Sequence, residues 1–281
     1  MITQFDFHKM EGISNDFVIT HGISETDIQP IVDQAVTICD RRRGIGADGI
    51  IFVLPSKVND FKMRIFNSDG SEAEMCGNGI RCFTLYIKAL NLSKLTKFAI
   101  ETLAGVMKTE IIDSVTVRVN MGKPILYAPD IPVATNRERI LMHDLQVKDK
   151  TFKINAVSMG NPHAVIYTDA LTDEMVLTYG PLIEKHPLFP KKINVEFIKV
   201  LSNKEIQMRV WERGCGETQA CGTGACASVV SGIINKLHDN EVTVHLPGGD
   251  LCISWAGGEE DPVMMTGPAR RAFTGTYKLT P

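Results

Sequence analysis

Short runs of apolar residues, some continuous and some alternating with polar ones, recur along the whole chain between turn residues. Such runs indicate β-strands, because successive side chains of a strand point to opposite faces of a sheet. Apolar residues at helical spacing are rarer and occupy residues 27–39, 80–90, 171–183 and 225–237. We expect strands at residues 16–20, 50–54, 61–66, 97–102, 115–119, 153–158, 164–168, 195–200, 206–211, 242–246 and 251–255. The pattern predicts a strand-rich chain with one long apolar helix in each half.

The chain contains an internal repeat with a constant offset of 145 residues. Residues 63–79 align without a gap to residues 208–224, and residues 15–19 resemble residues 161–166 more weakly. Six of the 17 positions in the first alignment are identical, namely Met63/Met208, Arg64/Arg209, Glu72/Glu217, Cys76/Cys221, Gly77/Gly222 and Gly79/Gly224. We infer two homologous halves, each with a strand, an acidic turn and a Cys-Gly-x-Gly sequence that opens an apolar helix.

A cysteine at the start of a helix has a specific chemical meaning. The backbone N–H groups there lack partners and the helix dipole is positive, so the thiol pKa is expected to fall from ~8.5 into the range of about 3.5 to 7.5. The glycines beside Cys76 and Cys221 leave room for a small anion such as a carboxylate. Two pseudo-symmetric halves would place the thiols on opposite sides of a cleft. Inverting a carbon stereocentre needs such a pair of opposed acid/base groups.

Other interpretations of these motifs are weaker. Buried, unreactive cysteines would leave the repeated Cys-Gly-x-Gly unexplained, and the seven cysteines lack the paired spacing of structural zinc sites, so no metal is expected. The sequence from Gly44 to Gly49 matches G-x-G-x-x-G, but a strand pattern follows it rather than a helix. The dinucleotide-binding interpretation therefore fails.

Composition narrows the function classes further. The 281 residues are 44% hydrophobic and 22% charged, with a net charge of −3, as in ordinary globular proteins. The only basic cluster, Arg41–Arg43, is more typical of a solvated helix end than of a phosphate site, so no nucleic-acid partner is expected. We also expect no membrane segment and no signal peptide. Seven cysteines suit a reducing compartment, and a cytoplasmic location is expected.

Two segments, residues 67–82 and 211–224, resemble the signature motifs of the diaminopimelate epimerase family. Supporting stretches lie at residues 9–17, 43–48, 159–163 and 194–195, in the family's order. The resemblance implies a cofactor-independent enzyme that interconverts LL- and meso-2,6-diaminopimelate, in lysine and peptidoglycan-precursor biosynthesis. It also implies two similar α/β domains, each a mixed sheet wrapped around a central helix, with the active site between them, commonly in a homodimer. We expect the domains to span residues 1–121, joined by 267–281, and residues 122–266.

The resemblance also assigns residues. Cys76 and Cys221 become the catalytic pair, either one acting as thiolate base according to the direction of reaction while the other is the thiol acid. A cradle for the substrate carboxylate falls on main-chain N–H groups of Gly77, Asn78, Gly222 and Thr223. The remaining substrate contacts fall on Asn15, Asn67, Asn161, His163, Asn194, Glu212 and Arg213. Arg213 has the planar fork suited to a distal carboxylate. Taken singly, each asparagine could equally be a turn residue, and the histidine a structural one.

Three positions depart from the family pattern. Ser14 stands where many members have glycine, Gly49 stands where some carry a substrate-contacting glutamine, and Thr223 replaces a serine. None of these changes removes a catalytic group.

Three rival functions remain open. An amino-acid racemase of the same fold would keep both cysteines without needing Arg213, Asn67 and Asn194 together. A non-catalytic relative of the same fold would lack one or both cysteines. A cysteine-based redox protein would carry a C-x-x-C pair, which the reactive cysteines here lack.

Overall fold

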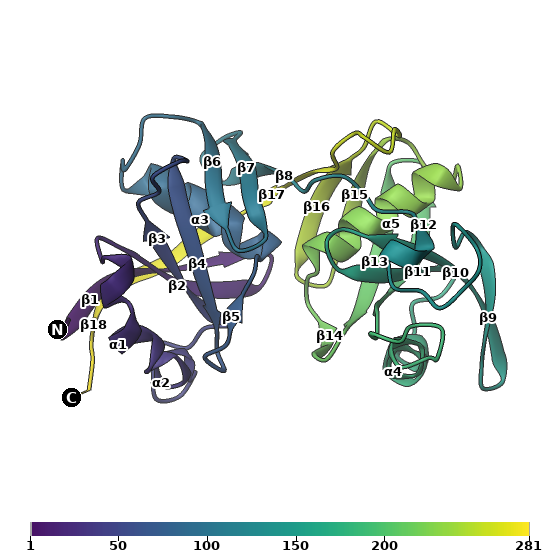
Figure 1. The fold of residues 1–281 in the computed structure, drawn as a ribbon, viewed down its shortest axis with the longest axis horizontal. Helices are drawn as coiled ribbons and strands as arrows, with labels where there is room; N and C mark the ends of the chain where they lie inside the picture. The colour runs from purple at the N-terminus through teal and green to yellow at the C-terminus, as the bar shows by residue number, and fades with distance from the viewer. Residues whose placement is uncertain (1, 281) are drawn as a thin grey trace. The chain divides into compact units, whose positions relative to one another are not determined.

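The two halves of the repeat fold into two units in the computed structural model, which describes residues 2–280 (Figure 1). Unit 1 comprises the residues up to Val119 together with the segment from Gly267 onward. Unit 2 comprises Asn120–Thr266. The chain therefore passes between the units twice.

Unit 1 contains a mixed sheet in which the strands are paired in the order β18, β1, β2, β3, β4, β6, β7. The short strand β5 is an additional partner of β4, and the small helices η1, α1 and α2 lie between β2 and β3 along the chain. The elements are β1 (Gln4–Gly12), β2 (Asn15–His21), η1 (Glu25–Asp27), α1 (Gln29–Val32), α2 (Ala35–Cys39), β3 (Gly49–Leu54), β4 (Phe61–Asn67), β5 (Glu72–Ala73), β6 (Lys97–Thr102), β7 (Gly105–Ile111), β8 (Thr116–Asn120) and β18 (Arg270–Lys278).

Unit 2 repeats this arrangement with strands paired in the order β9, β10, β11, β12, β13, β15, β16, β17. The elements are η2 (Ala128–Asp130), β9 (His143–Val147), β10 (Lys150–Ser158), β11 (Pro162–Tyr167), the π-helix η3 (Glu174–Tyr179), α4 (Gly180–Glu184), β12 (Asn194–Ser202), β13 (Glu205–Glu212), β14 (Gly216–Thr218), β15 (Glu241–Leu246), β16 (Gly249–Ser254) and β17 (Met264–Pro268). The pairs β2–β3 and β4–β6 are parallel in unit 1, and their counterparts β11–β12 and β13–β15 are parallel in unit 2. The internal repeat of the sequence thus corresponds to a repeated order and direction of strands.

Each sheet curves around one central helix of 13 residues, α3 (Gly77–Ala89) in unit 1 and α5 (Gly222–Ile234) in unit 2. Helix α3 contacts β1, β2, β3 and β7, and α5 contacts β10, β11, β12 and β16, so strands from distant positions in each sheet reach the same helix. Figure 1 shows α3 and α5 in these positions. Both helices are buried over most of their length, which explains their apolar sequences. The expected mixed α/β fold with a sheet around a central helix is confirmed.

The local predictions were most accurate where apolar runs are long. Each predicted strand is present, and residues 97–102 match β6 without a shift. The continuous helix predicted over residues 27–39 is wrong, because the chain turns at Asp33 and Gln34, where the Gln34 side chain bonds to the backbone of Thr280. The helix predicted over residues 171–183 begins only at Glu174 and is partly a π-helix. Within residues 2–280, no helix combines the length and apolar character needed to cross a membrane.

Candidate active site

Cys76 and Cys221 occupy equivalent positions at the amino ends of the two central helices. Each has an extended backbone and is the N-cap residue, and each Sγ accepts a hydrogen bond 3.4 Å long, from the N–H of Gly79 and Gly224 respectively. Sulfur here takes the place of the oxygen that usually caps a helix. The first N–H groups of each helix, including those at Gly77 and Gly222, point toward the same end of the helix. The predicted placement of both cysteines at helix starts is confirmed.

Glycine at the third helical position of each motif allows side chains of the sheet to lie close beneath the helix. A Cβ atom on Gly79 would lie 3.0 Å from Cδ1 of Ile51, and one on Gly224 would lie 2.7 Å from Oε1 of Glu196. The Gly-x-Gly spacing therefore packs the start of each helix against its sheet.

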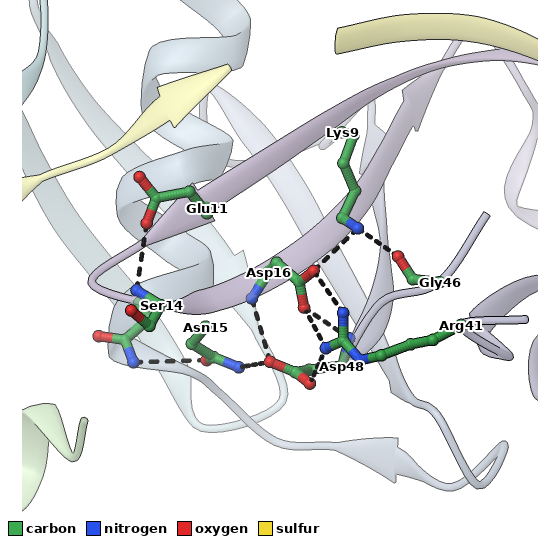
Figure 2. Close-up of polar contacts among 9 residues, drawn as sticks. Lys9, Glu11, Ser14, Asn15, Asp16, Arg41, Gly46 and Asp48 are labelled. Atoms are coloured by element: carbon green, nitrogen blue, oxygen red, sulfur yellow. Dashed lines mark hydrogen bonds and ion pairs between the residues drawn. The ribbon is translucent and has the colours of Figure 1, made fainter. Parts of the chain in front are cut away.

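In unit 1, the amide of Asn15 is held between two partners. Its Nδ2 donates to Oδ2 of Asp48 at 2.6 Å (Figure 2), which leaves Oδ1 as the acceptor for the Sγ of Cys76 at 3.5 Å and for Nδ2 of Asn78 at 3.4 Å. Asp48 thus fixes which end of the Asn15 amide faces the thiol.

Asp48 belongs to a network of charged side chains, as Figure 2 shows. Arg41 donates to both carboxylate oxygens of Asp16, at 2.9 and 2.7 Å, and to Oδ1 of Asp48 at 2.7 Å, while Lys9 pairs with Asp16 at 2.8 Å. Burial alone would raise the pKa of Asp16, but the hydrogen bonds from Arg41 and Lys9 outweigh it and hold that pKa well below its usual range. Arg41 therefore has a structural partner on β2, which the sequence did not reveal.

The other residues expected in unit 1 are tied into turns and strands. Asn67, at the end of β4, donates from Nδ2 to Oγ of Ser71 at 3.0 Å, and it lies opposite Gly49 in the β3–β4 pairing. A Cβ atom on Gly49 would lie 2.6 Å from the carbonyl oxygen of Phe66. A larger side chain at position 49 would therefore require the backbone of β3 or β4 to shift.

In unit 2, His163 lies between a carboxylate and an amide. Its Nδ1 is 2.7 Å from Oε1 of Glu196 and its Nε2 is 3.0 Å from Oδ1 of Asn161, and the side chains of His163 and Glu196 are both completely buried. His163 and Asn161 were predicted from the sequence as site residues, whereas Glu196 was not. A single acidic residue in an apolar strand gave no local signal of burial.

Two acidic side chains, Glu212 and Glu196, lie near Cys221. Burial raises the pKa of Glu212, while a hydrogen bond from the Thr218 hydroxyl and the nearby His163 oppose that rise. Burial also raises the pKa of the Cys221 thiol, and the charges of Glu212 and Glu196 raise it further, against a smaller opposing effect of its contact with Thr223. The expectation that a helix start lowers the thiol pKa is therefore wrong for Cys221, because desolvation and two carboxylates outweigh the helix end.

The turn after β13 carries Arg213 and is fixed by two buried side chains. Asn194 accepts from the N–H of Arg213 at 2.9 Å and donates to the carbonyl of Pro162 at 2.8 Å. Glu184 accepts from Gly214 N–H at 3.1 Å. The guanidinium of Arg213 is exposed and donates to the carbonyl of Lys191 at 3.3 Å. Asn194 thus fixes the position of the Arg213 backbone in this structure.

The remaining cysteines differ from these two. Cys39, Cys82 and Cys226 are buried, Cys252 is partly buried and Cys215 is exposed. Burial raises the pKa of Cys39 to about 11. No group of three or more His, Cys, Asp or Glu side chains within residues 2–280 is arranged to hold a metal ion.

Comparisons with known proteins agree on one family. Residues 7–127 and 155–272 match the family model described as diaminopimelate epimerase. The chain is 51% identical over 277 residues to the diaminopimelate epimerase of Carboxydothermus hydrogenoformans, covering 98% of this chain and 100% of that protein. It is 50% identical over 280 residues to that of Halothermothrix orenii, covering 97% of each.

Solved structures share the fold at low sequence identity. A hydroxyproline epimerase from Agrobacterium vitis superposes with a TM-score of 0.70 at 14% identity, over 99% of this chain and 93% of that one. A phenazine biosynthesis protein of the PhzF family from Bacillus anthracis gives 0.68 at 17% identity, over 98% and 99%. The neighbours show the fold alone, whereas the family match and the full-length relatives show that this chain belongs to the diaminopimelate epimerase family.

Proposed function

We propose that this chain is an isomerase that interconverts LL- and meso-2,6-diaminopimelate, with Cys76 and Cys221 as its acid/base pair. The observation that carries the proposal is the cysteine N-cap on the central helix of each unit. Positive helix ends favour negative charge beside each sulfur. One thiolate would remove the α-proton and the other thiol would protonate the opposite face of the carbon.

The helix starts would also stabilise the intermediate. Removing the α-proton of an amino acid moves negative charge onto its carboxylate, and preorganised N–H groups at Gly77, Asn78, Gly222 and Thr223 are suited to accept it. The Asn161 side chain and the exposed Arg213 guanidinium would hold the polar ends of the substrate. Exclusion of water would strengthen these interactions.

We propose that Cys221 begins the reaction as the thiol. Burial and two neighbouring carboxylates raise the pKa of Cys221, which favours its thiol form at neutral pH. Cys221 would then be the proton donor and Cys76 the base in the resting enzyme. One turnover exchanges these states, and the reverse reaction starts from the exchanged form.

Isotope incorporation tests the two-thiol mechanism directly. With LL-diaminopimelate in deuterated water, the product isomer should acquire α-deuterium at early conversion while recovered substrate should not, because each face of the carbon is served by a different thiol. Cys76→Ala and Cys221→Ala should each lose at least about 10²-fold in turnover, whereas Cys252→Ala serves as the matched control. Equal early labelling of substrate and product, or normal turnover by either cysteine variant, would refute the mechanism.

An amino-acid racemase acting on another substrate is the second candidate, because a hydroxyproline epimerase shares the fold. The same isotope assay with proline, hydroxyproline and histidine separates the two candidates. Labelling of one of these, but not of diaminopimelate, would favour the racemase.

We further propose a cytoplasmic location and a homodimer. A reaction that depends on two reduced thiols suits a reducing compartment, and the family resemblance supports the dimer. Light scattering at micromolar concentration distinguishes a dimer from the 31.0 kDa monomer.

A further inference from the structure

A completely buried acid and base lie beneath the start of helix α5. Oε1 of Glu196 is 2.7 Å from Nδ1 of His163, and among the described residues Oε2 of Glu196 has no hydrogen-bond partner. Burying a carboxylate with one unpaired oxygen costs free energy. A buried pair of this kind is weak evidence for stability and calls for another explanation.

The repeat supplies a comparison within the same molecule. His163 lies opposite Asn194 in the β11–β12 pairing, as Phe17 lies opposite Gly49 in the β2–β3 pairing. Two residues further along each second strand are Glu196 in unit 2 and Ile51 in unit 1, and both lie against the third residue of the central helix.

In unit 1 the positions of His163 and Glu196 are therefore occupied by two buried apolar side chains, Phe17 and Ile51. The fold does not need charge at this position, since its own first half does without it. The acid and base of unit 2 are an addition specific to the half that carries Cys221.

The added acid lies close to the thiol of that half. A single point, the Cβ position on Gly224, lies 2.7 Å from Oε1 of Glu196 and 3.2 Å from Sγ of Cys221. On the far side of the imidazole, Nε2 of His163 meets Asn161. Among the described residues, Glu212 of β13 is a further titratable group close to this cluster.

We infer that Glu196 is a positioning residue for the Cys221 half of the site. Its carboxylate accepts the Nδ1 proton of His163 and so fixes the ring with Nε2 toward Asn161. Its negative charge beside Cys221 favours the thiol over the thiolate and so sets Cys221 as the proton donor. This inference rests on the proposed two-thiol mechanism.

Glu196→Gln tests the charge while keeping the shape. Removing a like charge beside the sulfur should shift the pH dependence of Cys221 alkylation by iodoacetamide about one unit lower, or about tenfold faster at fixed neutral pH. Peptide mass spectrometry reads Cys76 in the same sample, and its rate should not change. Glu196→Asp keeps the charge, so the pH dependence of Cys221 alkylation should remain that of the wild type. Glu205→Gln, an exposed site on β13 in the same unit, controls for net charge.

Steady-state kinetics give a second measurement. In Glu196→Gln the alkaline limb of the kcat profile, where Cys221 must still hold its proton, should move down by about one pH unit. KM should change by less than about twofold. A thermal melt of each variant identifies any that fails to fold.

Two results would overturn the inference: Cys221 alkylation that follows the wild-type profile in Glu196→Gln, or an equal change at Cys76. Normal turnover by Cys221→Ala would instead refute the proposed mechanism. The alkylation measurement does not depend on turnover, so the two failures are distinguishable.

Discussion

Replacing Arg81 with methionine should destabilise unit 1 substantially. Arg81 lies in the first turns of α3 and is completely buried. Its guanidinium donates to the carbonyl of Gly77 at 3.0 Å, to Oδ1 of Asn78 at 3.0 Å and to the carbonyl of Pro268 at 3.1 Å. Methionine has a similar length and no donor, so these three acceptors would lose the same partner at once.

The magnitude follows from those three bonds. A buried acceptor left without a partner costs roughly 1–3 kcal/mol. Oδ1 of Asn78 is buried and the carbonyls of Gly77 and Pro268 are partly buried, so the total loss should be about 3 kcal/mol. For a protein of this size, that loss lowers the melting temperature by roughly 6–12 °C. Because Asn78 also loses its restraint, kcat/KM should fall as well.

Differential scanning calorimetry of the purified variant provides the measurement. Arg118→Met removes an exposed arginine of the same unit and should change stability by less than about 0.5 kcal/mol. Arg81→Lys keeps the charge but not the planar fork and should lie between wild type and Arg81→Met. A melting temperature for Arg81→Met within about 2 °C of wild type would show that Arg81 does not hold the helix start to the Pro268 segment.

Three further predictions concern binding, strain and pH. Arg213→Lys should reduce kcat/KM for diaminopimelate more than tenfold, because a single ammonium cannot replace a bidentate guanidinium; wild-type kinetics would exclude Arg213 as the carboxylate contact. Ser14 has a left-handed backbone with φ of 69° in the β1–β2 turn, so Ser14→Gly should gain about 0.5–1 kcal/mol in urea unfolding, and a loss would contradict the strain. Since the folded pKa of Asp16 is depressed, its ion pairs stabilise fully above the unfolded value of ~3.9 and are lost as pH falls below it. Urea unfolding between about pH 5 and pH 2 should therefore show a steeper loss of stability in wild type than in Asp16→Asn, and parallel curves would contradict this.

Elements that are encoded locally could be predicted from the sequence. Long apolar runs such as residues 97–102 determine strands by themselves, and the Cys-Gly-x-Gly repeat determines two helix caps. The predicted helices started three residues late, at residues 80 and 225, because glycine has poor helix propensity even where a cap begins the helix.

Contacts between distant residues were not recoverable from local pattern. Strand β18 is largely exposed and forms because β1 pairs with it from the other end of the chain. Glutamate side chains usually face solvent, but Glu196 is buried in the apolar part of β12, and its partner His163 belongs to another strand. The raised pKa of Cys221 comes first from burial and then from the charges of Glu212 and Glu196, none of which its position at a helix start indicates.

The return of the chain to unit 1 has a consequence for synthesis. Strand β18 pairs with β1 across Gln4 and Lys278, and all of unit 2 is translated between these strands. The ribosome must therefore synthesise residues 120–266 before it synthesises β18. All residues of unit 2 are thus present while the sheet of unit 1 still lacks its edge strand. Until then β1 exposes unpaired backbone groups of the kind that recruit other strands. Truncation within residues 270–278 would leave the backbone groups of β1 permanently unpaired. It would therefore destabilise unit 1, although most of that unit is translated first.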